Sequence, residues 1–272
     1  TPWSVLNDMT ERNLELWKQM QSKFVGDATA AKASAKPVRG SAICRTLAES
    51  GRTVIAADLG VREDRIAEFK AEMADLGERV QFEALNVADE QSCNDLVARV
   101  TAQHGRVDVL VNAAGITRDT TLRKMSTAQW QDLMRVNLDG VFYMSRAGVE
   151  GMCDRGFGRI VNISSVNGQT GQFGQTNYSA SKAGLHGFTM ALAREVARKG
   201  VTVNSVSPGY CRTAMVMSIP DNIREQIISQ IPVGRIGEPS DIARAVDFLA
   251  AEDAGFLTGV NLPVNGGLFI SF

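Results

Sequence analysis

Short apolar segments alternate with amphipathic segments along most of the chain. The apolar segments carry valine, isoleucine and small residues, and they are the predicted strands: 53–59, 80–87, 107–115, 158–166, 201–209 and 259–267. The segments between them place apolar residues at steps of three and four, and they are the predicted helices: from 41 onward, 62–77, 89–105, 127–152, 177–200 and 239–252. Near-continuous apolar strands between helices indicate a parallel sheet covered on both faces. The pattern therefore predicts an α/β fold with a doubly wound parallel sheet.

The amino-terminal segment follows a different pattern. Residues 1–25 repeat apolar side chains at helical spacing, which predicts an amphipathic helix, and residues 26–37 are small and polar, which predicts a linker. We therefore divide the chain into an arm with its linker, 1–37, and one α/β domain, 38–272. The arm either packs on the domain or a neighbouring subunit, or it docks on another protein or a hydrophobic surface.

Composition narrows the classes of partner. The chain has 272 residues, 44% of them hydrophobic, and a net charge of -1. This charge gives no strong electrostatic attraction for nucleic acid or an anionic membrane. No apolar run approaches the roughly 20 residues that span a bilayer. The four cysteines lie far apart and form no C-x-x-C pair: Cys44, Cys93, Cys153 and Cys211. We expect reduced thiols in a cytoplasmic protein, no metal site, and surface or helix-end positions for His104 and His186.

A tyrosine and a lysine one helical turn apart carry the main chemical signal. Tyr178 and Lys182 form Y-x-x-x-K at the start of a predicted helix, so their side chains point the same way. An ammonium beside a phenol favours the phenolate and lowers the tyrosine pKa, which suits general acid-base catalysis. The alternative is a pair of surface neighbours. Ser165 ends the preceding strand and would project toward the same crevice, while Asn137 is a polar amide among apolar helix neighbours and must find partners when buried.

Two further strand ends carry small residues or a rigid turn, which are typical of a sheet edge that faces a ligand. Asn112, Ala113 and Gly115 belong to the small-residue run "NAAG", which lets a flat ligand approach the backbone. The run "PGY", residues 208–210, makes a rigid turn where a nicotinamide ring could lie. Tight turns without a ligand would explain the same residues.

These positions together resemble the short-chain dehydrogenase/reductase family. The resemblance rests on Asn137, Ser165, Tyr178 and Lys182 with the runs "NAAG", "SPG" and "NGG", and it extends over about residues 40–267. Within the family, the stretches 167–210 and 231–243 resemble the acetoacetyl-CoA reductases of polyhydroxybutyrate synthesis. The resemblance implies a Rossmann-like fold and a homotetramer.

The family's mechanism gives each of the four positions a role. Ser165 would hydrogen-bond the substrate carbonyl, and Tyr178 would donate a proton to its oxygen as hydride reaches the carbon. Lys182 would favour the phenolate and hold the nicotinamide ribose, and Asn137 would anchor a water relay that returns the proton. The resemblance also implies residues that bind the acyl thioester: Ser165, Gln172, Phe173, Gln175, Tyr178 and Tyr210.

The nucleotide-binding motif is incomplete. The family places T-G-x-x-x-G-x-G between its first strand and first helix, and Gly40, eighteen residues before Asp58, fits the last of these glycines. The run "AKPVR" stands where the strand and the rest of the loop belong. Without that strand the next one loses its partner in the sheet. We therefore predict that residues are missing from this sequence near 38–40; the alternative is a true deletion, and intact mass distinguishes the two.

The resemblance also implies which residues contact the cofactor: Gly40, Asp58, Asn86, Val87, Asn112, Ala113, Gly115, Tyr178, Lys182, Pro208, Gly209 and Thr213. A carboxylate at Asp58 accepts both ribose hydroxyls of NAD and repels the 2′-phosphate of NADP. Arg62 is close enough in sequence to pair with that phosphate, and many acetoacetyl-CoA reductases use NADPH. We predict NADH, with NADPH as the alternative.

Three functions follow from these features. The first is reduction of acetoacetyl-CoA to (R)-3-hydroxybutyryl-CoA. The second is reduction of 3-oxoacyl groups on acyl-carrier protein, by the same chemistry. The third is a non-catalytic scaffold of polymer granules, which the amino-terminal arm and the broken glycine motif favour and the intact catalytic positions oppose.

Overall fold

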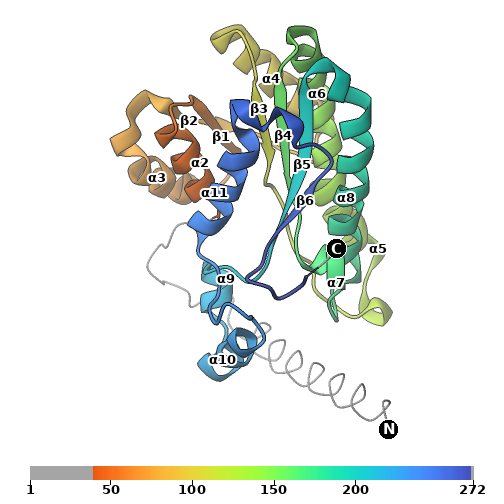
Figure 1. Cartoon of the computed structure of the whole chain (residues 1–272). Coiled ribbons are helices and arrows are strands. Elements are labelled where there is room, and N and C mark those ends of the chain that lie inside the picture. The colour runs from red at the N-terminus through yellow and green to blue at the C-terminus, as the bar shows by residue number, and fades with distance from the viewer. Residues whose placement is uncertain (1–38, 271–272) are drawn as a thin grey trace.

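Two parallel sheets form the centre of the molecule. The computed structural model describes residues 39–270 (Figure 1). The smaller sheet pairs β1 (Val54–Asp58) with β2 (Val80–Ala84). The larger sheet has the order β3-β4-β5-β6. Its strands are β3 (Val109–Asn112), β4 (Gly158–Ile163), β5 (Val201–Pro208) and β6 (Asn261–Val264). All pairings are parallel, which confirms the predicted class of sheet.

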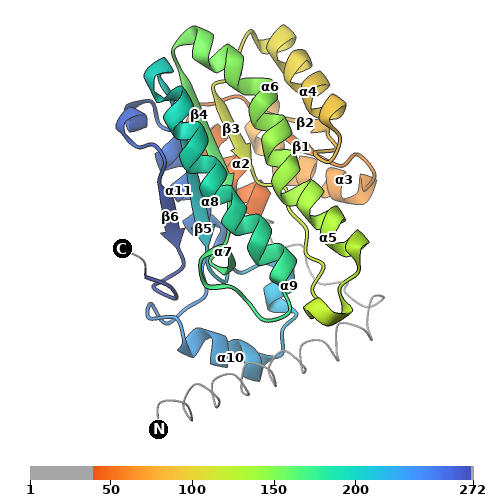
Figure 2. The same ribbon diagram turned by 90° about the vertical axis from the view of Figure 1, so that its right-hand side faces the viewer.

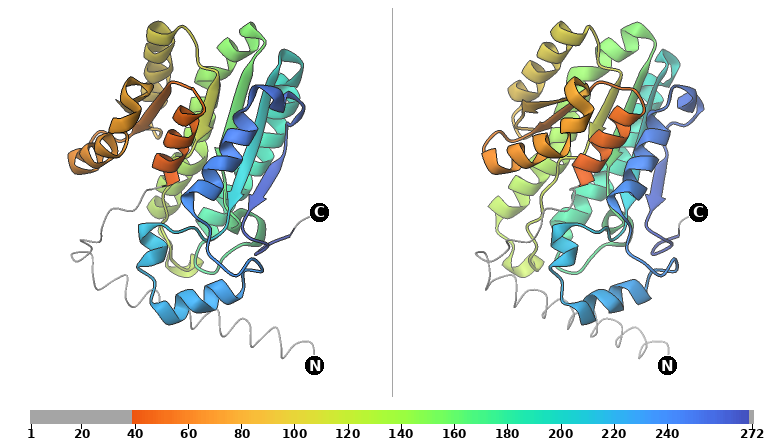
Figure 3. Two further views of the ribbon diagram at one scale, coloured as in Figure 1. Left: turned by 60° about the vertical axis from the view of Figure 1, so that its left-hand side comes forward. Right: turned by 90° about the vertical axis from the view of Figure 1, so that its left-hand side faces the viewer.

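Helices cover both faces of these sheets. On one face lie α4 (Glu90–His104), α5 (Thr127–Met134), α6 (Gly140–Arg155) and α8 (Thr176–Val196) (Figure 2). On the other lie α2 (Arg39–Glu49), α3 (Glu63–Glu72) and α11 (Pro239–Ala250) (Figure 3). The short helices α7 (Asn167–Thr170), α9 (Ala214–Met217) and α10 (Asp221–Ser229) lie near the ends of β4 and β5.

Successive residues of the central strands feed two separate cores. Ile160 of β4 is fully buried in the cluster with Met144, Met152 and Val203, on the α6 and α8 side. Its neighbour Val161 is fully buried in the other cluster, on the side of α2 and α11. This alternation is the period of two that a strand imposes, and it explains why two successive residues of β4 are both apolar. A third cluster, defined by Val216, Ile219, Ile223, Ile227, Ile231 and Ile236, packs around α9 and α10.

Both ends of α4 follow local sequence signals. Asp89 accepts a hydrogen bond from the Gln91 amide at the start of α4, and Gly105 ends that helix in the left-handed region. The predicted helices differ from the structure in where they end and in where they change type. The helix expected over 62–77 ends at Glu72 and continues as a 3₁₀ segment. The helix expected over 127–152 contains a π-helical turn, Arg135–Asp139, between α5 and α6.

The sheet is interrupted between β1 and β3. Within residues 39–270, β1 pairs only with β2 and β3 pairs only with β4. The resemblance to the family predicts a strand before α2, and that strand would lie in this interruption. Whether residues are missing near 38–40 stays a prediction. The predicted arm and linker, 1–37, lie outside the described residues.

Candidate active site

Lys182 is held at the carboxyl end of β4. Its ammonium nitrogen donates a hydrogen bond to the Ile163 carbonyl at 2.8 Å, and its side chain is almost fully buried. The Ser164 hydroxyl donates to the backbone carbonyl of the same lysine at 2.8 Å, which ties α8 to the end of the strand. The ammonium lies 5.8 Å from the centroid of the Tyr178 ring. This distance lies within the range of a cation–π contact.

Asn137 connects the π-helical turn to the strand edge. The side chain is fully buried, and its oxygen accepts from the Ile116 amide at 2.8 Å while its nitrogen donates to the Ile116 carbonyl at 3.0 Å. The same nitrogen donates to the Ser181 hydroxyl at 3.3 Å. Asn137 therefore joins the segment after β3 to α8, one residue from Lys182. A π-turn inside an α-helix is often a functional feature, and here it places this amide.

Gly115 lies between the Lys182 ammonium and the Asn137 side chain. A Cβ atom built at this position would lie 3.5 Å from both the Lys182 nitrogen and the Asn137 oxygen. Ala113 and Gly115 are exposed, whereas the Asn112 amide is buried and donates to the Asn162 oxygen at 2.9 Å. A ligand at this edge can thus approach the backbone of 113–115, but the Asn112 side chain is committed to the interior.

Ser165 follows this strand end directly. It is 8% exposed, and its hydroxyl accepts from the Asn167 amide at 3.2 Å, so the hydroxyl hydrogen is available to a carbonyl acceptor. Tyr178, in the first turn of α8, is half-buried. The structure therefore brings together Asn137, Gly115, Lys182 and Tyr178. It places Ser165 on the loop just after Ile163, whose carbonyl binds the Lys182 ammonium.

His186 completes a polar layer behind the lysine. Its Nε2 lies 2.8 Å from the Ser164 hydroxyl and 3.2 Å from the Ser207 hydroxyl. The expectation of a surface or helix-end position is wrong for this residue, which sits half-buried in the middle of α8. Burial, and secondly the charge of Lys182, lower the pKa of His186. His104, in contrast, is the last residue of α4, as expected.

The residues expected to bind substrate lie on the loop between β4 and α8 and after β5. Gln175 donates to Asp119 at 2.7 Å and accepts from Asn167 at 2.8 Å, so both ends of its amide have protein partners. Phe173 is 39% exposed, which leaves an apolar face open, and Gln172 is half-buried. Tyr210 packs against the cluster around α9 and α10, and burial raises its pKa. Their contacts with substrate stay predictions.

The residues expected around the far end of the cofactor are spread along the other strand ends. Asp58 is exposed at the end of β1, and its carboxylate accepts from the Leu59 amide at 2.7 Å. Arg62 forms an exposed ion pair with Asp64 at 2.8 Å rather than with Asp58. Asn86 accepts from the Ala88 amide, and Val87 packs against Gly140.

Three more of the expected cofactor residues lie at or after the end of β5, and one lies at the start of α2. The Pro208 carbonyl accepts from Val166 and the Gly209 amide donates to Val264, so both are fixed by neighbouring strands. The Thr213 hydroxyl accepts from the Val216 amide at 3.4 Å. Gly40 lies in the first turn of α2 and lines the cavity beside Asp58.

The residues expected to bind the cofactor fit the two ends of a dinucleotide better than its central pyrophosphate. The exposed Asp58 carboxylate suits ribose hydroxyls, and the open backbone of 113–115 beside Lys182 suits the nicotinamide ribose. The pyrophosphate needs a glycine-rich turn before a helix, and within the described residues α2 begins at Arg39 with Gly40 alone. The fit is therefore partial.

Sequence reasoning missed the residues that position the site. Ile163 and Ile116 act through backbone groups, which no side-chain pattern reveals. Asn167 and Asp119, which hold Gln175, had no distinguishing spacing. His186 could have been found, because a histidine one turn after Lys182 shares its helix face.

Comparison with known proteins places the chain in a family of oxidoreductases. Residues 39–269 match the family model described as enoyl-(acyl carrier protein) reductase. The chain belongs to the short-chain dehydrogenase/reductase family, whose members use a nicotinamide cofactor.

Its relatives include reductases of 3-oxoacyl thioesters. The acetoacetyl-CoA reductase of Allochromatium vinosum is 51% identical over 231 residues, which cover 85% of this chain and 94% of the relative. That of Cupriavidus necator is 50% identical, with 84% and 93% covered. The 3-oxoacyl-[acyl-carrier-protein] reductase FabG of Haemophilus influenzae is 45% identical, with 85% and 94% covered.

Residues 39–270 contain neither a membrane-spanning helix nor a cluster of metal ligands. In this part of the chain no helix is long and apolar enough to cross a bilayer. In the same residues no group of three or more histidine, cysteine, aspartate or glutamate side chains is placed to hold a metal ion. All four cysteines are free thiols.

The lowered pKa of His186 predicts a stability that falls in mild acid. The unfolded chain protonates this histidine near its ordinary pKa of 6.5, whereas the folded chain binds the proton only at lower pH. Stability is therefore full above about pH 7 and decreases as pH falls through 6.5 toward the folded pKa. Urea unfolding at pH 7.5 and 5.5 should show a smaller acid-induced loss for His186→Gln than for the parent chain. His104→Gln, the matched control, should keep the parent's loss; an unchanged loss in His186→Gln would contradict the assignment.

Proposed function

We propose that this chain reduces acetoacetyl-CoA to (R)-3-hydroxybutyryl-CoA with a nicotinamide cofactor, and so supplies polyhydroxybutyrate synthesis. The observation that carries the proposal is the buried Lys182 ammonium, 5.8 Å from the Tyr178 ring, beside a strand end that leads into Ser165. The names of the relatives at about 50% identity support acetoacetyl-CoA as the substrate.

Each residue of the site has a defined task in carbonyl reduction. The Ser165 hydroxyl donates a hydrogen bond to the 3-oxo oxygen and orients it. Tyr178 gives its phenolic proton to that oxygen as negative charge develops there. The Lys182 cation stabilises the phenolate that this transfer leaves. When bound, the nicotinamide supplies the hydride that the carbonyl carbon receives.

Asn137 positions the groups around Lys182 and takes part in returning a proton to Tyr178. Its two bonds to Ile116 and one to Ser181 fix the wall behind Lys182. We assign to it the anchoring of the water relay that returns a proton to Tyr178. In this proposal the acyl-thioester pocket is formed by Phe173, Gln172, Gln175 and Tyr210. The exposed Phe173 ring faces the short acyl chain. Gln175 contributes to the pocket while its amide keeps its hydrogen bonds to Asp119 and Asn167.

We further propose NADH as the preferred cofactor. The exposed Asp58 carboxylate repels a 2′-phosphate and accepts ribose hydroxyls. The ion pair of Arg62 with Asp64 leaves that guanidinium less available to a phosphate. Asn86 and Val87 flank the adenine, and Pro208, Gly209 and Thr213 lie at the nicotinamide end. The proposed enzyme is a cytoplasmic homotetramer.

A second candidate keeps the chemistry and changes the carrier. The relatives named 3-oxoacyl-[acyl-carrier-protein] reductase, at 45% identity and below, support a substrate carried on acyl-carrier protein. A net charge of -1 gives no general attraction for an acidic carrier, which favours the CoA thioester.

Replacing the phenol should abolish turnover without unfolding the protein. Tyr178→Phe should lower kcat for acetoacetyl-CoA by at least about 10²-fold, because general acid catalysis contributes roughly 10²–10⁴. Tyr143→Phe, a half-buried tyrosine on α6 packed in a core cluster, is the matched control and should keep kcat within about two-fold. Steady-state assays and far-ultraviolet circular dichroism measure the two effects. Full activity in folded Tyr178→Phe would exclude the mechanism.

Removing the carboxylate at the end of β1 should change the cofactor preference. Asp58→Ala should raise kcat/KM with NADPH relative to that with NADH by about ten-fold or more, because it removes the repulsion of the 2′-phosphate. Asp64→Ala is the control that frees Arg62 while keeping Asp58. An unchanged ratio in Asp58→Ala would show that Asp58 does not select the cofactor.

The choice of substrate is tested by parallel assays. Acetoacetyl-CoA and acetoacetyl-acyl-carrier protein should be compared at equal concentrations, each with NADH and NADPH. We expect kcat/KM to be higher for the CoA thioester. A higher value for the carrier-protein thioester would favour the second candidate, and no change of NADH fluorescence on mixing would favour the non-catalytic scaffold.

A further inference from the structure

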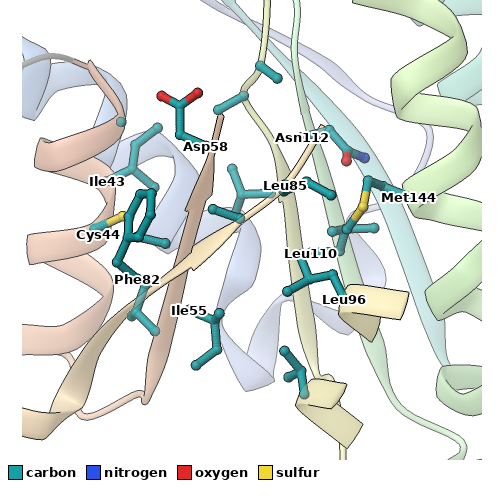
Figure 4. A pocket seen from close by; sticks show the side chains of 18 of the residues that line it. Ile43, Cys44, Ile55, Asp58, Phe82, Leu85, Leu96, Leu110, Asn112 and Met144 are labelled. Atoms are coloured by element: carbon teal, nitrogen blue, oxygen red, sulfur yellow. The ribbon is translucent and has the colours of Figure 1, made fainter. Parts of the chain in front are cut away.

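Two rows of hydrogen-bonded polar side chains connect the larger sheet to α8. In the first row, Asn112 of β3 donates to Asn162 of β4 at 2.9 Å, and Asn162 donates to Thr189 of α8 at 2.9 Å. Figure 4 shows the Asn112 side chain turned toward Met144 of α6 and away from Asp58. Because a buried polar group is costly without a partner, these bonds select one packing of the helix on the sheet.

The second row joins α8 to three strands through His186. The Nε2 atom of this histidine lies 2.8 Å from the Ser164 hydroxyl, just after β4, and 3.2 Å from the Ser207 hydroxyl of β5. Ser207 in turn donates to the side-chain oxygen of Asn261 in β6 at 2.7 Å. Ser164 and Ser207 are both buried, so their hydroxyl groups depend on these protein partners.

The Ser164 hydroxyl determines which nitrogen of His186 carries the proton. This hydroxyl has one hydrogen, which it donates to the Lys182 backbone carbonyl at 2.8 Å, and a carbonyl oxygen can only accept. Toward His186 the Ser164 oxygen is therefore an acceptor, and Nε2 must be the donor. Ser207, whose hydrogen goes to Asn261, places the same requirement on Nε2. Neutral His186 is thus the tautomer with the proton on Nε2.

Two anchors on successive turns fix the direction of α8. Tyr178, Lys182 and His186 follow one another at steps of four, so they lie along one face of the helix. Lys182 binds the Ile163 carbonyl, and His186 binds Ser164, the next residue of the chain. The lysine stem is flexible, whereas the imidazole is a rigid ring close to the helix backbone. His186 therefore restricts sliding and tilting of α8 more strictly than Lys182 can.

The two serines of this row stand directly before residues of the proposed site. Ser164 precedes Ser165, and Ser207 precedes Pro208 at the nicotinamide end. The backbones of these two strand ends also meet, because the Val166 amide donates to the Pro208 carbonyl at 2.9 Å. A donor that holds both serines against α8 therefore sets the position of the helix relative to both strand ends.

We propose that His186 is a positioning residue for carbonyl reduction and acts through its Nε2–H donor. The donor holds α8 at one distance from the ends of β4 and β5, which places the Tyr178 phenol against Ser165. His186 itself touches neither substrate nor cofactor, and its role rests on the proposed function. A misplacement of about 1 Å can cost roughly 10²-fold in rate, so loss of the donor should affect kcat more than substrate binding.

The kinetic test removes the donor and then restores it. His186→Leu keeps a bulky side chain without a donor, whereas His186→Gln places an amide N–H near the position of Nε2. His186→Leu should lower kcat for acetoacetyl-CoA at least about ten-fold with KM within about three-fold of the parent value, and His186→Gln should keep kcat within about three-fold. The matched control is Thr189→Val, which removes a buried polar partner of the first row. It should lower the melting temperature and keep kcat within about two-fold.

Nuclear magnetic resonance tests the tautomer without turnover. The chain has two histidines, so the untagged, nitrogen-labelled protein has two imidazole rings, and His104→Gln identifies the signals of His186. At about pH 8, above the ordinary histidine pKa of about 6.5, the His186 ring should show a protonated Nε2 and an unprotonated Nδ1. Ser164→Ala removes one acceptor and should shift the Nε2 signal, whereas Thr189→Val should leave it unchanged.

Several results would overturn the role of His186. Equal losses of kcat in His186→Leu and His186→Gln would show that the donor is not what matters. Unchanged kcat in a folded His186→Leu with a lowered melting temperature would mean that the residue only stabilises the fold. A protonated Nδ1 in an active parent would contradict the role of His186 alone, even where the leucine variant does not fold. A parent that reduces no 3-oxoacyl thioester would instead contradict the proposed function, and the positioning role with it.

Discussion

The burial of one ammonium group is the constraint from which the site follows. A lysine that is 4% exposed must have hydrogen-bond partners, and Lys182 finds one in the Ile163 carbonyl at the end of β4. The Ser164 hydroxyl, bonded to the lysine's own carbonyl, fixes α8 against the same strand end. Tyr178, one turn earlier on α8, and Ser165, in the loop after β4, follow from the same anchor through their positions in the chain. The order of the chain thus places the residues of the proposed reaction site around one anchored charge.

The two halves of the fold depend on the central sheet to different degrees. The half that carries the proposed chemistry stands on β3 to β6, which are continuous, and its strand ends hold one another through Asn112 and Asn162. The half that carries Asp58 stands on β1 and β2, which have no ladder to the larger sheet within the described residues. Helix α2 links them, because Ile43 and Leu47 pack in the same cluster as Ile242 and Val246 of α11. The half with Asp58 is thus attached by this apolar packing and by the polar contacts of Arg52 and Ser50 with Asp247 of α11, rather than by strand pairing.

The sequence predicted the elements that have a strong period and missed what depends on tertiary contacts. The six strands and the main helices follow from apolar alternation, and the family match confirms the class of fold. The π-turn at Asn137 could not be predicted, because one extra residue hardly alters a helical pattern. Helix α10 was missed because its apolar face meets only the small cluster after β5. The inward direction of the Asn112 amide and the polar layer around His186 depend on partners far away in the sequence.

A double-mutant cycle tests the central claim most directly. The account holds that the Lys182 charge acts through the Tyr178 phenol, so kcat should be measured for Tyr178→Phe, Lys182→Met and the pair, with folding checked by circular dichroism. If the two groups act as a unit, the double variant should be no slower than the slower single variant, within about three-fold. Losses that multiply, so that the double variant falls well below both singles, would show that the two groups act independently and would contradict the account.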